Sequence, residues 1–370
     1  MSTPGRSQAL TPEGEARRVV IREDAPLWVL LGNRHGDNRQ LLAIAEALGR
    51  PYRAVQLRFG RGARLAPARW FAHRLTWRSD PELAPPWPRA VLAAGRKSVP
   101  AALWIRRASA GKTRLVHVNR PWAPLAWFDL VVTTPQYALP ERDNVLVNLL
   151  PFVPPVDPAP LPASFAARAA ALPRPWTAVL VGGNSRPFVL DAGAATRLAA
   201  TVNDEVRRAG GGAWVLDSPR TPAAAMAALE RALEVPALPA RFGRDENVYA
   251  ALLGLADRFV VTADSASMLT EALLSGKPVT PFALPADADW RWRLGAAWRR
   301  AAERAPRSLA ARMLDKLVGL GLVSSVRDLG RLQQELDGAG LFAGEGRALA
   351  VAAAERARTV ARINAVIDRP

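Results

Sequence analysis

The sequence contains no cysteine, only three histidines and no long apolar run. Without cysteine the chain has no disulfide, no thiol nucleophile and no thiolate metal site. The histidines, His35, His73 and His117, are too scattered to predict a metal site. No apolar run approaches the roughly 20 residues that a membrane-spanning helix requires, and residues 1–20 lack the apolar core of a signal peptide. We therefore expect a cytoplasmic protein that uses neither a metal nor a cofactor.

Positive charge is what the sequence has in excess, with 50 Lys and Arg against 33 Asp and Glu and a net charge of +17. The arginines are spread along the chain without a block of like charge or a nucleic-acid recognition motif, so we do not expect a nucleic-acid partner. Anionic ligands or an acidic membrane surface fit this charge equally well.

One basic, aromatic stretch bears on the membrane question. Residues 66–78 carry Trp70 and Trp77 seven positions apart on one helical face, with Arg74 between them. Such a helix can lie on an anionic bilayer, at the inner face of the membrane. The alternative is an ordinary helix with its aromatic side chains in the core and its arginines in solvent.

A length of 370 residues with 49% hydrophobic residues predicts two domains. We expect a disordered tail over residues 1–20 and a first domain over 21–150. The proline-rich stretch 151–175 is the predicted linker to a second domain over 176–340. The final segment, 341–370, predicts a long helix that either crosses back onto the first domain or serves in dimerisation.

Apolar strands alternate with helical segments in both halves, which predicts an α/β fold with doubly wound parallel sheets. The first unit is typical. Leu27–Leu31 predicts a buried strand and Gln40–Leu48 a helix, which Gly49 ends. The other predicted strands cover residues 53–57, 89–94, 115–118, 130–132, 144–149, 178–181, 213–216 and 258–262.

In open α/β sheets, ligands bind at the carboxyl ends of the strands, so the loops there hold the candidates of the first half. His35 and Asp37 follow the strand 27–31, and either could act as a general base. Their ordinary roles are a solvated loop histidine and a helix cap. Two cations and a hydroxyl follow the strand 89–94, which suits an anionic group of a substrate. The candidates for an acceptor or cleft are Asn38, Arg96, Lys97 and Ser98.

The second half opens with a glycine-rich turn at residues 182–185, between a strand and a helix. Glycine permits close backbone approach and a helix N-terminus favours anions, so the turn is either an anion cradle or an ordinary tight turn. It matches neither the P-loop nor the dinucleotide fingerprint. Ser265 and Ser267 begin another helix, where Glu271 either accepts hydrogen bonds from a ribose or complements the helix dipole.

Five segments between Leu27 and Phe282 resemble the mitochondrial-fission Elm family, whose bacterial members are often labelled nucleoside-diphosphate-sugar epimerases. They are GDNRQLLAIAEALG, AAGRKSVPAALWIRR, VLVGGNSRPF, SPRTP and VTADSASMLTEALLSGKPV. The last is also similar to GT-B glycosyltransferases such as the enzyme that makes lipid II and lipid A disaccharide synthase. The resemblance implies a GT-B-like fold, with two Rossmann-like domains facing across a cleft.

The same resemblance implies a donor site. Glu271 would bind the donor ribose. The implied diphosphate contacts are Gly183, Asn184, Ser185, Arg220, Ser265, Ala266 and Ser267.

The expected function is a metal-independent glycosyltransferase that transfers the sugar of a nucleoside-diphosphate-sugar donor to an acceptor, for which a component of the cell envelope is one candidate. The absence of an Asp-x-Asp pair fits a mechanism in which helix termini and Arg220 stabilise the leaving diphosphate. The alternatives are a nucleoside-diphosphate-sugar epimerase and a non-catalytic, membrane-associated scaffold.

Overall fold

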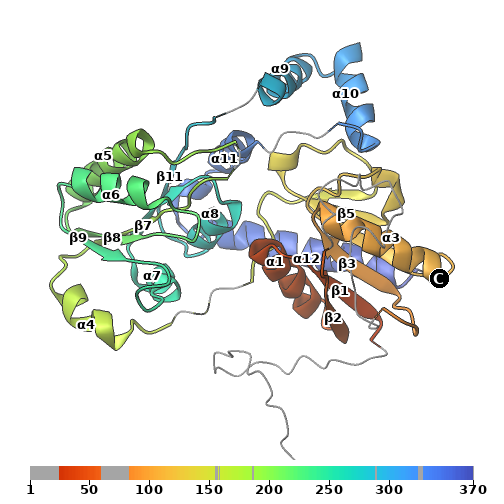
Figure 1. Cartoon of the computed structure of the whole chain (residues 1–370), viewed down its shortest axis with the longest axis horizontal. Helices are drawn as coiled ribbons and strands as arrows, with labels where there is room; N and C mark the ends of the chain where they lie inside the picture. Colours follow the sequence, from red (N-terminus) through yellow and green to blue (C-terminus); the bar gives the residue numbers. More distant parts are fainter. Residues whose placement is uncertain are drawn as a thin grey trace, which may run out of the picture.

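The computed structural model describes residues 25–59, 83–154, 157, 159–185, 187–287, 290–323 and 328–369. The predicted tail at 1–20 and the predicted helix at 66–78 lie outside the described residues. Two parallel sheets dominate the fold, one in each half of the chain (Figure 1).

The first sheet has the order β2-β1-β3-β4-β5-β6. Its strands are β1 (Leu27–Leu31), β2 (Tyr52–Gln56), β3 (Ala90–Ala94), β4 (Arg114–Val118), β5 (Leu130–Thr133) and β6 (Val145–Val147). Alternate residues of β1 enter different cores: Leu27 and Val29 belong to the core beneath α1 (His35–Ala47), and Trp28 and Leu30 to the core beneath α3 (Val99–Ala108). Burial on both faces explains why this strand is apolar throughout.

The second sheet has the order β11-β10-β7-β8-β9. Its strands are β7 (Trp176–Leu180), β8 (Gly212–Leu216), β9 (Ala237–Ala240), β10 (Arg258–Thr262) and β11 (Val279–Phe282). The helices α5 (Ala192–Ala209) and α6 (Ala223–Ala232) share one core with it, and α7 (Tyr249–Leu255) and α8 (Ala266–Leu273) share the other.

Two elements of this half were not predicted. The strand β9 has the sequence ALPA, in which alanine and proline carry no strand signal. The helix α4 (Ala163–Ala170) lies inside the stretch predicted to be a linker. Its Phe165 and Ala169, four positions apart, are buried in the core of the second sheet, which stabilises the helix despite the surrounding prolines.

Each sheet has one point at which its strand order reverses. In the first sheet this switch point lies between β1 and β3, and in the second between β7 and β10. Open α/β sheets bind ligands at such switch points, at the carboxyl ends of the strands. The loops that leave these four strands are the same loops that carry the candidate residues.

Beyond the second sheet the chain returns to the first half. The helices α9 (Trp290–Arg304) and α10 (Leu309–Gly319) contribute Ala302, Leu314 and Val318 to a core of the first sheet. After α11 (Leu329–Gly338), the long α12 (Arg347–Ile367) runs between the halves (Figure 1). Its first residues pack in the core that the second sheet shares with α7 and α8, and its last residues contact β4 and β5 of the first sheet. In the part of the chain that the structure describes, no helix combines the length and apolar character needed to cross a bilayer.

Candidate functional site

A cavity of 370 Å³ lies at the switch point of the first sheet. It is lined by the loops that follow β1, β3 and β4. The candidates among its lining residues are Asp37, Asn38, Arg96 and Lys97; the others include Arg34, Phe59, Asn119, Arg120, Trp122 and Tyr137. Four predicted residues from two distant loops therefore meet in one cavity.

The helix α1 starts earlier than the sequence indicates. Its N-cap is Arg34, and neither Asp37 nor Asn38 caps it. The Asn38 side chain instead ties down the loop, because it accepts from the Gly32 N–H at 2.8 Å and donates to the Gly32 carbonyl at 2.9 Å. Asp37 thereby lies in the first turn of the helix, half-buried at the cavity, with Asn119 Nδ2 at 3.5 Å from its Oδ1.

Two other candidates in these loops do not line this cavity. His35 is exposed at the start of α1. Ser98 is 1% exposed, and its hydroxyl is within hydrogen-bonding distance of the Ala94 carbonyl at 2.8 Å and the Gly95 carbonyl at 2.9 Å. Ser98 therefore holds the turn after β3 in shape, and its hydroxyl faces the backbone.

The sequence did not indicate the role of His117, which lies fully buried at the end of β4. Its Nδ1 faces the Asn119 carbonyl at 3.2 Å and its Nε2 faces the Gly95 carbonyl at 3.4 Å. Burial lowers the pKa of His117 to about 4, so the ring is neutral at pH 7. The imidazole links two loops that line the cavity, and it is a positioning residue.

Arg120 is the most deeply placed cation of the cavity, with 5% exposure. Burial, followed by the nearby Arg299, lowers the pKa of Arg120 to about 9. Its guanidinium lies over the Trp122 ring at 4.7 Å and donates to the Val323 carbonyl at 2.6 Å. The segment after α10 therefore holds one wall of the first-sheet cavity.

The glycine-rich turn after β7, for which the sequence allows an anion cradle or an ordinary tight turn, has partners for its amides within the protein. The Gly182 N–H donates to Thr262 Oγ1 at 2.7 Å, and the Gly183 N–H donates to Asp264 Oδ2 at 3.2 Å. The Asn184 N–H donates to the Arg220 carbonyl at 3.3 Å, and the Ser185 N–H to the Phe188 carbonyl at 3.0 Å. These amides have partners within the protein, and their contact with a diphosphate stays a prediction.

The glycines are required here by close packing. A Cβ atom on Gly182 would lie 2.1 Å from the Asp264 carboxylate, and one on Gly183 would lie 2.0 Å from the Arg220 carbonyl oxygen. The Asn184 side chain accepts from the Leu190 N–H at 2.9 Å and so organises the turn itself. The residue types fit the motif, but in this structure they bring protein groups together.

Asp264 is the centre of this switch point, although the sequence did not single it out. Its carboxylate is 0% exposed and accepts from the Thr262 hydroxyl at 2.8 Å as well as from Gly183. Arg220 Nη2 lies 3.0 Å from Asp264 Oδ2, and the Arg220 side chain remains 41% exposed. Arg220 therefore reaches the switch point with its charge directed at a buried carboxylate, and its contact with a diphosphate stays a prediction.

The start of α8 faces the first sheet. Ser265 is its N-cap and its hydroxyl accepts from the Met268 N–H, while Ala266 is buried. A Cβ atom on Gly36 would lie 3.9 Å from Ser267 Oγ, which places that hydroxyl beside the first turn of α1. The loop that carries Asp37 and the start of α8 are therefore neighbours across the two halves.

Glu271 follows one turn later and is 3% exposed. Arg39 Nη1 of α1 lies 2.8 Å from Glu271 Oε1 and forms an ion pair with it, without the geometry of a hydrogen bond. The Tyr249 hydroxyl donates a hydrogen bond to Glu271 Oε2 at 2.5 Å. Burial, and then the Glu271 charge, raises the pKa of Tyr249. The predicted ribose ligand, Glu271, thus has two protein partners.

Among the described residues, no three His, Asp or Glu side chains gather closely enough to hold a metal ion.

Two doubly wound parallel sheets and a final helix that runs between them define a GT-B-like α/β fold, which confirms the predicted fold class. The family model for mitochondrial fission ELM1 matches residues 35–306. The chain belongs to this family, as the sequence motifs indicated.

Among curated proteins, the chain is 28% identical over 218 residues to mitochondrial fission protein ELM1 of Arabidopsis thaliana. The match covers 52% of this chain and 51% of that protein, so it spans about half the length of the relative.

Solved structures with a similar chain path share little sequence. MurG of Acinetobacter baumannii is 14% identical with a TM-score of 0.40, over 90% of this chain and 99% of that one. A UDP-glucosyltransferase of Polygonum tinctorium is 9% identical with a TM-score of 0.47, over 94% and 99%. The UDP-GlcNAc 2-epimerase of Neisseria meningitidis is 10% identical with a TM-score of 0.40, over 85% and 99%.

Proposed function

We propose that the chain binds a nucleoside-diphosphate sugar between its two sheets and transfers the sugar to an acceptor held in the first-sheet cavity. The observation that carries this proposal is the meeting of two loops. The turn with Asp37 lies beside Ser267 and is linked to Glu271 through the Arg39 ion pair. A general base on one sheet and a ribose ligand on the other are thereby brought to the same place.

The acceptor cavity suits an anionic molecule. Its cations are Arg34, Arg96, Lys97 and Arg120, and its one carboxylate is Asp37. The Lys97 ammonium lies over the Phe59 ring at 5.3 Å, which provides an aromatic surface next to the charge. In this proposal Asp37 accepts the proton of an acceptor hydroxyl, whose oxygen then attacks the anomeric carbon of the donor sugar.

The leaving nucleoside diphosphate takes the electron pair of the broken glycosidic bond. The N-terminus of α8, at Ser265 to Ser267, and the exposed part of Arg220 stabilise its charge. Because the amides of the glycine-rich turn are engaged, we assign the diphosphate to α8 in preference to Gly183. When the ribose binds, its hydroxyls either replace Arg39 as the partner of the Glu271 carboxylate or share that carboxylate with Arg39.

A non-catalytic scaffold is the second candidate, and two observations favour it. The glycine-rich turn satisfies its own amides, and Glu271 already has Arg39 and Tyr249 as partners. Such a site keeps the GT-B shape without presenting a donor cradle. An epimerase requires acid and base groups around the sugar that we do not assign.

Calorimetric titration of the full chain with nucleoside diphosphates and their sugars separates these functions. The transferase predicts saturable binding that Glu271→Gln weakens about tenfold or more, whereas Glu335→Gln, an exposed glutamate of α11, leaves it unchanged. Release of free nucleotide only when an acceptor is present indicates transfer, and conversion of the sugar without an acceptor indicates an epimerase. If no nucleotide binds, the scaffold is the correct function.

A further inference from the structure

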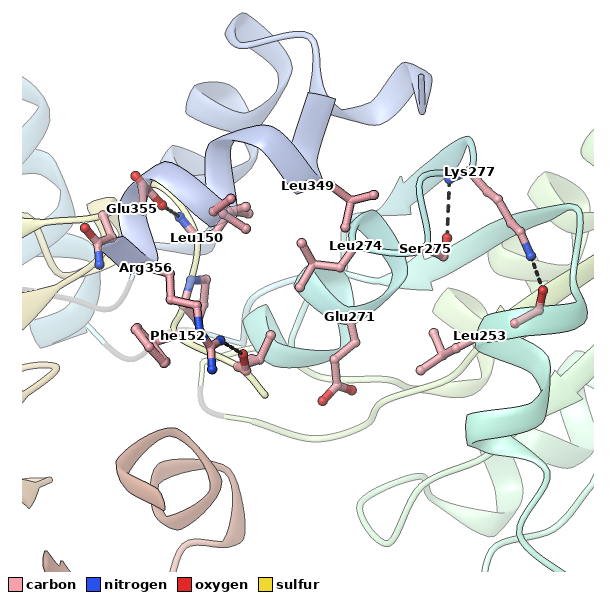
Figure 2. Close-up of a pocket in the computed structure, with 16 residues that line it drawn as sticks. Leu150, Phe152, Leu253, Glu271, Leu274, Ser275, Lys277, Leu349, Glu355 and Arg356 are labelled. Atoms are coloured by element: carbon pink, nitrogen blue, oxygen red, sulfur yellow. Dashed lines mark hydrogen bonds between the residues drawn. The ribbon is translucent and has the colours of Figure 1, made fainter. Parts of the chain in front are cut away.

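A second cavity, of 470 Å³, lies where the chain passes between the two halves. Five segments line it: residues 148–153 after β6, the end of α7, the second half of α8, the turn that follows α8 and one face of α12 (Figure 2). Ligand cavities in proteins measure roughly 300–1,000 Å³, so this one can hold a small molecule. It is separate from the first-sheet cavity, with which it shares no lining residue.

The walls of this interdomain cavity are largely apolar. Its apolar lining includes Leu150, Phe152, Val153, Leu253, Leu274, Leu349 and Ala352. On α12, the lining residues Leu349, Ala352, Ala353 and Arg356 recur every three or four positions, so one face of the helix forms a wall. Leu349 is 49% exposed and lines the cavity together with Leu274, as Figure 2 shows. A hydrocarbon ligand would remove this apolar surface from water.

Both carboxylates that line the cavity are already satisfied. Glu355 accepts from the Leu149 N–H at 2.5 Å and the Leu150 N–H at 3.0 Å. Glu271 is paired with Arg39 and accepts from Tyr249. Both carboxylates therefore already have partners within the protein, and these contacts stabilise the fold.

The two cations of the cavity are held differently. Arg356 lies over the Phe152 ring at 4.5 Å and donates once, to the Val153 carbonyl at 3.3 Å, as Figure 2 shows. Lys277 donates to the Gly254 carbonyl at 2.5 Å. Within the described ranges, neither cation lies within 4.0 Å of a carboxylate oxygen. Burial lowers the pKa of both groups.

The cavity is apolar, its two carboxylates already have partners, and its two cations are not paired with a carboxylate of the described residues. A ligand that fits these features is an anion with an apolar tail. We propose that the interdomain cavity binds a single-chain fatty-acid-like anion, with its tail against α8 and α12 and its head on Arg356. A guanidinium has five N–H donors in a fork that matches a carboxylate, and Arg356 uses one of them on the backbone.

The bound anion would touch two of the segments that cross between the halves, residues 148–153 and α12, and also α8, which carries Glu271. Occupancy therefore stabilises one relative arrangement of the two sheets. This site is an effector site, and its existence does not rest on the proposed transferase function.

Calorimetric titration of the full chain with decanoate, below micelle-forming concentrations, tests the site. We expect saturable binding of one decanoate per chain, with butyrate at least about a hundredfold weaker because it buries fewer methylene groups. Decyl maltoside, which has the same tail and no charge, should bind about tenfold or more weakly than decanoate.

Matched variants of α12 locate the ligand. Arg356→Gln should weaken decanoate binding about tenfold, while Arg358→Gln removes the same charge from the same helix and should leave it unchanged. Ala352→Trp fills the cavity and should abolish binding, while Ala354→Trp, at an exposed position outside the lining, should not. Melting curves of all four variants establish that they fold.

Three results of the decanoate titrations would overturn the proposal. They are no saturable binding of decanoate by the wild-type chain, equal affinity in Arg356→Gln and Arg358→Gln, and undiminished binding in a folded Ala352→Trp variant. Binding to vesicles of anionic lipid without binding of decanoate would also overturn it, because that result assigns the cations to a membrane surface. Loss of nucleotide binding in Glu271→Gln leaves the proposal intact, so the two functions are tested separately.

Discussion

Arg39 and Glu271 connect the two halves of the molecule: Arg39 Nη1 of α1 lies 2.8 Å from Glu271 Oε1 of α8. The two ends of this ion pair differ in exposure. The Arg39 side chain is 40% exposed and the Glu271 side chain 3%. Water can therefore solvate the arginine when its partner is lost, but it cannot reach the glutamate in the same way.

This asymmetry predicts unequal costs of mutation. Arg39→Gln leaves a buried carboxylate that keeps only the Tyr249 hydroxyl, and should lower the free energy of unfolding by about 2 kcal/mol. Glu271→Gln leaves a partly solvated arginine, and should cost about 1 kcal/mol. Urea denaturation of both variants and of the double variant measures the coupling. Equal costs in the two single variants would contradict the assignment.

Asp37 is predicted to be the general base. Asp37→Asn keeps the shape of the side chain but removes its basicity, and should lower the turnover of a nucleoside-diphosphate sugar about 10²–10⁴-fold. Donor affinity, measured by calorimetry, should stay within a factor of about two because the proposed ribose and diphosphate ligands are on α8. His35→Asn is the matched control and should retain turnover, since His35 does not line the cavity. Wild-type rates in Asp37→Asn would remove Asp37 from the mechanism.

The buried, neutral imidazole of His117 should make the protein less stable in mild acid. Its pKa is about 4 in the folded protein and 6.5 in the unfolded chain. The unfolded chain therefore binds the proton first, so the stabilisation is complete above pH 6.5 and is lost as the pH falls toward 4. Between pH 7.5 and 5.5 the loss should be about 1 kcal/mol. Denaturation of wild type and His117→Gln over this range tests it, and parallel pH profiles would show that the histidine is not responsible.

Glycine substitutions distinguish close packing from simple flexibility. Gly183→Ala places a Cβ atom 2.0 Å from the Arg220 carbonyl oxygen and should destabilise the protein by several kcal/mol or displace the turn. Gly193→Ala lies in α5, with ordinary contacts of 3.5 and 3.6 Å. It should stabilise the protein by about 0.5–1 kcal/mol, because alanine favours the helix. Thermal melting of both variants is sufficient, and a neutral Gly183→Ala would show that the turn can move.

The sequence predicted the alternation of strands and helices because that signal is local. The strands β1 and β3 of the first sheet are short apolar runs, and β10 occupies the residues predicted for it. The prediction missed elements where tertiary burial replaced local preference. Phe165 and Ala169 stabilise α4 within a proline-rich stretch, and β9 forms from a sequence with little strand preference.

The candidate site was only partly predictable for the same reason. Asp37, Asn38, Arg96 and Lys97 were found because strand ends in a parallel sheet share one edge. Asp264 and His117 were missed as site residues, since their partners are not adjacent in the sequence. The Asp264 carboxylate meets the Gly183 amide across 81 positions, and His117 meets the Gly95 carbonyl across 22.

By itself, the sequence determined the α/β class, the positions of most strands along the chain and the family. Apolar periodicity and contiguous motifs are properties of neighbouring residues. Only the tertiary structure decided which polar groups are spent on the fold and which line a cavity. The Gly183 amide and the Glu271 carboxylate have the chemistry of ligand-binding groups, but Asp264 and Arg39 reach them from other elements. A buried hydrogen-bonding group takes whichever partner the packing of distant segments provides.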